Sequence, residues 1–174
     1  YRFTTTDENG VYQMMADPRS RFIYYSLPAG YAIMQDPSTH LPLFFKGIDH
    51  SAEKERVDFT IAKLSGSSTA FSFAVLGDIH VRDKATGKTF REGAMKQIGE
   101  YFKANPSAGA VFGVSLGDII NNAKDPETFG YTREALGSAL LGDGKYLPFY
   151  EVIGNHDHNA RLGDTEKTGT DAFD

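Results

Sequence analysis

Two kinds of hydrophobic pattern divide the chain. In residues 1 to about 64, apolar and polar positions alternate over short runs such as 11–15 and 22–25, and turn residues such as Pro28-Ala29-Gly30 separate these runs. Alternation with a period of two is typical of half-buried strands. The first part of the chain therefore predicts an all-β sandwich module whose last strand covers 56–64.

Continuous apolar runs replace this alternation in the second part of the chain. Stretches with helical periodicity lie between the runs, which occupy 71–76, 110–116 and 147–153, with the helical stretches at 90–104 and 131–141. Buried strands that alternate with helices favour a largely parallel sheet covered on both faces. The predicted fold class of this part is therefore α/β.

A segment of small residues, Ser65-Gly66-Ser67-Ser68-Thr69, lies where the pattern changes. Small flexible residues of this kind are typical of linkers. We therefore expect two domains, a β-sandwich module over 1–66 and an α/β domain over 67–174.

Polar residues suited to chemistry follow each of the three apolar runs. The three groups are Gly77-Asp78-Ile79-His80, Gly117-Asp118-Ile119-Ile120-Asn121 and Gly154-Asn155-His156-Asp157. Because the carboxyl ends of parallel strands meet at one edge of a sheet, these side chains are expected to converge. Oxygen and nitrogen ligands of this kind suit manganese, iron or zinc. Two such ions about 3.5–4 Å apart can clamp an in-line displacement at phosphorus.

These three groups, in this order and each after a strand, resemble the motifs of the calcineurin-like metallophosphoesterase family over residues 70–158. The resemblance implies an α+β sandwich of the metallophosphoesterase type. It also implies hydrolysis of a phosphate mono- or diester by metal-bound hydroxide at a dinuclear centre of manganese, iron or zinc. By position, Asp78 and His80 would hold the first metal, Asp118 would bridge both metals, and Asn155 would hold the second.

The resemblance also implies roles for the remaining residues of the third motif. His156 would stabilise the transferred phosphoryl group or protonate the leaving oxygen, and Asp157 would orient His156. Asn121 would brace a loop, and His158 is expected to be a solvated loop histidine.

Two stretches of the first part, Thr6-Asp7-Glu8-Asn9-Gly10-Val11-Tyr12 and Leu27-Pro28-Ala29-Gly30-Tyr31, resemble prealbumin-like β-sandwich modules. Such modules precede catalytic domains in secreted bacterial enzymes, so the resemblance implies a periplasmic, secreted or cell-envelope location. The match begins part-way into such a module. Six aromatic residues here favour core or inter-domain packing over a carbohydrate platform: Phe22, Tyr24, Tyr25, Tyr31, Phe44 and Phe45.

Family members contribute a later histidine and a Gly-His-x-His motif, and no histidine follows His158. We therefore expect a truncated catalytic domain that lacks some metal ligands and is inactive by itself. The alternative is a non-catalytic binding module built on a degenerate or truncated phosphoesterase fold. A nucleotide-binding α/β domain is disfavoured, because no Gly-x-Gly-x-x-Gly or Walker-type loop occurs.

The composition also excludes some classes of binding partner. The formal net charge of −5 argues against a general nucleic-acid binder. No apolar run approaches the ~18–20 residues that span a bilayer, and the absence of cysteine excludes disulfides and thiolate metal ligands. The partner that the family resemblance implies is a phosphate-ester substrate, and the oligomeric state is left open.

Overall fold

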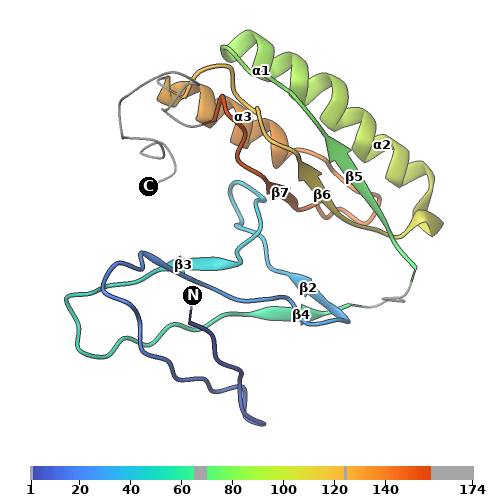
Figure 1. Ribbon diagram of the computed structural model, residues 1–174. Coiled ribbons are helices and arrows are strands. Elements are labelled where there is room, and N and C mark those ends of the chain that lie inside the picture. Colours follow the sequence, from blue (N-terminus) through green and yellow to red (C-terminus); the bar gives the residue numbers. More distant parts are fainter. Residues whose placement is uncertain (1, 65–69, 124, 158–174) are drawn as a thin grey trace.

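Figure 1 shows the computed structural model of the protein, which describes residues 2–64, 70–123 and 125–157. An antiparallel β region, here called the N-terminal module (2–64), lies beside a layer of parallel strands and helices, here called the α/β region (70–157). The predicted mixed α/β architecture is therefore confirmed. The boundary between residues 66 and 67 stays a prediction, since the expected linker 65–69 lies outside the described residues.

The N-terminal module contains two small antiparallel sheets. Strand β1 (Phe22–Tyr24) pairs with β3 (Phe45–Gly47), and β2 (Tyr31–Ile33) pairs with β4 (Ile61–Lys63). The last strand is therefore much shorter than the predicted 56–64.

The alternating run 11–15 forms no strand in the described part of the chain, so that prediction was wrong. Val11 and Met15 keep 61% and 78% of their surface exposed, because no neighbouring strand pairs with this segment or covers it. Alternation predicts a strand only where a partner supplies the ladder of hydrogen bonds.

The α/β region is built on a parallel sheet with the strand order β5 (Ser72–Leu76), β6 (Ala110–Ser115), β7 (Phe149–Glu151). Pairing between the first two strands continues past their ends, where the Val81 N–H donates to the carbonyl of Ile119 at 3.0 Å. The predicted parallel sheet is therefore confirmed, and the loops that leave β5 and β6 run side by side.

A long helical segment joins β5 to β6. It consists of α1 (Lys84–Phe90), the π-helical stretch η1 (Arg91–Met95) and α2 (Lys96–Ala104), and the 3₁₀ turn η2 (Pro106–Ala108) follows. The predicted start at Phe90 was late, because the helix begins at a capping box. The Asp83 carboxylate accepts the Thr86 N–H at 2.8 Å, and such a cap starts a helix before its apolar periodicity becomes visible.

The second helix, α3 (Pro126–Leu136), also lies earlier in the chain than the predicted 131–141. It starts at Pro126, after an N-cap aspartate, Asp125, that accepts the Glu127 N–H at 3.1 Å. Leu140 was assigned to the helix from the sequence, but it pairs with Tyr146 in a turn between α3 and β7. None of the helices in the described ranges is long and apolar enough to cross a membrane.

The helices cover one face of the sheet, so the prediction that helices cover both faces was wrong for the described residues (Figure 1). Their core contains Val81, Phe90, Met95, Phe102, Ala135, Leu136, Ala139, Leu147 and Phe149. On the opposite face Phe73 stacks on Phe112 at 5.1 Å and remains 49% exposed. Tyr150 on that face contacts Phe44 of the N-terminal module, with ring centroids 5.6 Å apart. Phe44 thus supplies inter-module packing, as expected, whereas Phe22, Tyr24, Tyr31 and Phe45 are exposed.

Candidate metal centre

Three residues of the candidate centre have an unusual backbone conformation. Asp78, His80 and Asp118 have positive φ angles of 47°, 51° and 51°, in the left-handed region. For residues other than glycine this conformation costs roughly 1 kcal/mol or more each. Such strain is typical of functional sites, where the rest of the structure holds the turn in place. Here the left-handed residues turn the chain sharply after β5 and after β6.

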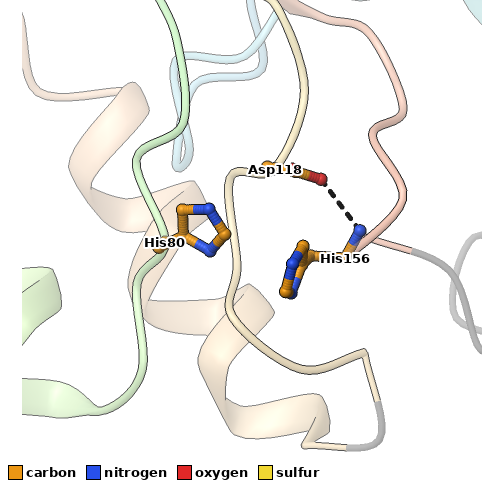
Figure 2. A group of neighbouring side chains, drawn as sticks. All are labelled: His80, Asp118 and His156. Atoms are coloured by element: carbon orange, nitrogen blue, oxygen red, sulfur yellow. Dashed lines mark hydrogen bonds between the residues drawn. The ribbon is translucent and has the colours of Figure 1, made fainter. Parts of the chain in front are cut away.

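Two glycines bring the loops after β6 and β7 into direct contact. A Cβ placed on Gly117 would lie 2.8 Å from the Cα and the nitrogen of Gly154. A Cβ on Gly154 would overlap the backbone nitrogen and the carboxylate of Asp118. The Asp118 Oδ1 in turn accepts the backbone N–H of His156 at 2.8 Å (Figure 2). The glycines of the second and third motifs are therefore required for this approach.

His80, Asp118 and His156 come together from the loops after β5, β6 and β7 (Figure 2). Each offers one ligand atom, and these atoms lie within 4.8 Å of one another. The two imidazole rings meet edge to face, with centroids 4.6 Å apart. Ligand atoms bound to one ion at about 2.0–2.2 Å lie up to about 4.4 Å apart, so a small closure would suffice. The nitrogen and oxygen donors fit zinc, manganese or iron.

The imidazole of His156 is held from behind by a main-chain oxygen. Its Nδ1 lies 3.0 Å from the carbonyl oxygen of Asn121. A carbonyl can only accept, so Nδ1 carries the proton in this contact and Nε2 is left for a metal or a substrate. Asn121 is fixed by its own N–H, which donates to the carbonyl of Val81 at 2.8 Å. Asn121 thus braces the loop through its main chain, and the role predicted for its side chain stays a prediction.

Asp157 is fully buried and joins two of the loops. Its Oδ1 accepts the Ile120 N–H at 3.1 Å, and its Oδ2 accepts the Gly154 N–H at 2.8 Å. Both oxygens thus bond main-chain groups, whereas the ring of His156 is held by Asn121. Asp157 therefore fixes the backbone around His156, and its predicted role of orienting the imidazole stays a prediction.

Of the other two predicted ligands, Asp78 lies outside the close group. The side chains of Asp78 and Asn155 are exposed, and Asp78 does not join His80, Asp118 and His156 within 4.8 Å. Their assignment as metal ligands stays a prediction. His158 lies outside the described residues.

Two polar residues at the ends of the strands escaped the sequence analysis. Glu151 ends β7, and its register partner on β6 is Ser115. Desolvation by the surrounding protein, and then the charge of Asp157, raise the pKa of Glu151 to about 7, although more than a third of the residue's surface stays exposed. The Ser115 hydroxyl is buried and has no hydrogen-bond partner among the described residues. The sequence could have indicated both residues, because a carboxyl and a hydroxyl within otherwise apolar runs are unusual.

Comparison with known proteins agrees with this arrangement. Residues 71–173 match a family model described as calcineurin-like phosphoesterase, and residues 1–64 match one described as the N terminal of calcineurin-like phosphoesterase. The chain therefore belongs to the calcineurin-like phosphoesterase family, a family of hydrolases that use divalent metals. A search of curated proteins and a search of solved structures gave no match. The prealbumin-like character of the N-terminal module stays a prediction.

Proposed function

We propose that the protein hydrolyses a phosphate mono- or diester at a dinuclear metal centre. The observation that carries the proposal is the convergence of His80, Asp118 and His156 at the carboxyl ends of three parallel strands. In open α/β sheets this edge is where ligands bind. Membership of the calcineurin-like phosphoesterase family supports the reaction class.

In this proposal the metals are manganese, iron or zinc. Asp78 and His80 would hold one ion, Asn155 would hold the other, and Asp118 would serve both. When bound, the ions supply neutralising charge for the phosphoryl oxygens and a water molecule of lowered pKa. The Asp118 carboxylate can serve them while it accepts the His156 N–H, because a carboxylate offers about four lone-pair sites.

His156 carries the proton chemistry in this proposal. Its Nδ1–H donates to the Asn121 carbonyl, and this contact persists when the ring takes up a second proton at Nε2. The protonated Nε2 can then donate to a phosphoryl oxygen or to the leaving oxygen. Loss of a positioned proton donor typically slows a reaction by about 10²–10⁴-fold.

Hydrolysis of an aryl phosphate and of an aryl phosphodiester by the full-length enzyme tests the proposal. Activity should disappear on treatment with a chelator and return with Mn²⁺, Zn²⁺ or Fe²⁺. His156→Gln should lower turnover about 10²–10⁴-fold, while His50→Ala should act as the wild type, because His50 bonds the carbonyl of Ser20 within the N-terminal module. Activity that survives exhaustive chelation would exclude the proposed mechanism. Metal binding without hydrolysis of either ester would instead favour a non-catalytic binding module.

A further inference from the structure

A loop of the N-terminal module, residues 36–41 and here called the docking loop, rests on the α/β region. The Nδ1 of His40 lies 2.9 Å from the carbonyl oxygen of Gly137, at the C-terminal end of α3. The same imidazole stacks on Tyr146, with centroids 3.6 Å apart and planes 7° from parallel. Because the carbonyl accepts, the Nδ1–H donates, and one side chain thus makes two contacts with residues about 100 positions away.

Hydrogen bonds within the docking loop and from Gln35 hold the loop in shape, in addition to these contacts. The Asp36 carboxylate accepts the N–H groups of Ser38 at 2.9 Å and Thr39 at 2.8 Å. The Ser38 hydroxyl, which donates to the same carboxylate at 2.6 Å, and then these two N–H groups hold the pKa of Asp36 well below its usual range. The Gln35 side chain bonds the carbonyl of His40 at 2.6 Å, and His40 itself has a left-handed φ of 57°. The loop is therefore a preorganised support for the imidazole.

The surface that receives the loop is shaped for close approach. A Cβ on Gly137 would overlap the carbonyl oxygen of Thr39, so only glycine fits at this point. Beside it, Leu41 packs against the core that the helices form on the sheet. The contact is therefore tight, with apolar burial as well as a hydrogen bond.

The docking loop contacts Gly137, directly after α3, and Tyr146, just before β7, and both elements adjoin loops of the metal centre. Helix α3 follows the segment 118–123, which supplies the Asp118 carboxylate and the Asn121 carbonyl. Tyr146 lies just before β7, which leads through Val152 to His156. Phe44 of the N-terminal module adds a contact to β7 itself through Tyr150.

We propose that the docking loop is a positioning element of the metal centre, which acts through α3 and β7 to hold His156 against Asp118. His40 touches neither metal nor substrate and is a positioning residue. The part of this inference that concerns metal affinity rests on the proposed function, whereas the part that concerns the position of His156 does not.

Amide hydrogen exchange in the metal-free full chain tests the position of His156, whose N–H bonds Asp118. His40→Ala should speed exchange at His156 by about fivefold to tenfold, because local opening becomes easier. The Leu116 N–H, which bonds the Leu76 carbonyl between β5 and β6 and away from β7, should change less. His40→Phe keeps the stack on Tyr146 and removes only the hydrogen bond, so it should give a smaller effect in a chain that remains folded. His50→Ala is the matched control.

Titration with Zn²⁺ is the second measurement, and His40→Ala should weaken binding by about threefold to thirtyfold. If the wild type binds no Zn²⁺, the proposed function fails and the exchange rates alone decide the inference. The inference is overturned if His40→Ala and His40→Phe leave His156 exchange at the rate of His50→Ala. It is equally overturned if His156 and Leu116 speed up by the same factor, since that pattern reports global destabilisation.

Discussion

Gly154 and Asp118 lie so close together that one added carbon atom at Gly154 should disturb the metal centre. A Cβ added at Gly154 would come closer than 3.0 Å to the backbone nitrogen and the carboxylate of Asp118, nearer than real Cβ atoms approach other atoms. Gly154 does not have a left-handed backbone, so alanine is compatible with its conformation. Gly154→Ala is therefore a purely steric change.

The size of the effect follows from what the new Cβ would meet. Part of the clash is with main chain, which cannot rotate away as the end of a flexible side chain can. Overpacking of this kind costs about 1–3 kcal/mol. Displacing groups that orient metal ligands typically lowers metal affinity by about 10- to 100-fold. Gly154→Ala should therefore bind Zn²⁺ about 10- to 100-fold more weakly than the wild type.

The matched control is Gly77→Ala on the loop after β5. Gly77 has the same place in its motif, its backbone is not left-handed, and a Cβ there would meet nothing within 4 Å. Competition with a chromophoric chelator measures the Zn²⁺ affinity of both variants, and circular dichroism checks that both are folded. Equal affinity in the two variants would refute the idea that close approach of the second and third loops builds the centre.

Two further changes test the strain and the charge at the strand ends. Asp78→Gly should raise the melting temperature of the metal-free protein by about 2 °C, because it removes a left-handed non-glycine residue at a smaller entropic cost. The same variant should gain less stability from added Zn²⁺, and an unchanged metal-induced shift would count against Asp78 as a ligand. For Glu151 the folded-state pKa of about 7 lies above the ordinary 4.5, so the folded protein binds the proton more tightly. The free energy of unfolding in urea should therefore fall as pH rises from about 4.5 to about 7, and Glu151→Gln should flatten this dependence; parallel curves for the two proteins would contradict the shift.

The sequence was sufficient to predict the parallel sheet and the motifs at its edge. Apolar runs that stop at Gly77, Gly117 and Gly154 mark buried strands that end in polar loops, and such loops must meet at one edge. The element boundaries were less accurate where capping chemistry or pairing decided them. The capping box at Asp83 starts the first helix before the residue that the apolar spacing predicts. Leu140 has helical spacing in the sequence, but it pairs with Tyr146 across a turn.

The detailed geometry of the centre could not be predicted, because main-chain groups make much of it. The Asn121 carbonyl holds His156, and the N–H groups of Ile120 and Gly154 hold Asp157. Every residue carries main-chain groups, so the residue type does not indicate which of these groups makes a contact in the centre. The docking of His40 on Gly137 joins residues 97 positions apart and leaves no local pattern in the sequence.

Zn²⁺ titration of the metal-free protein, with and without the Asp118 carboxylate, tests whether the three loops form one metal centre. Asp118→Asn should bind Zn²⁺ much more weakly than the wild type, because it replaces the charged ligand between His80 and His156 with an amide. Asp125→Asn is the matched control, since Asp125 caps α3 and asparagine caps equally well. The prediction is wild-type affinity in Asp125→Asn and loss of binding in Asp118→Asn. Equal Zn²⁺ affinity in the wild type and both variants would show that the bound metal lies elsewhere and would contradict the centre described above.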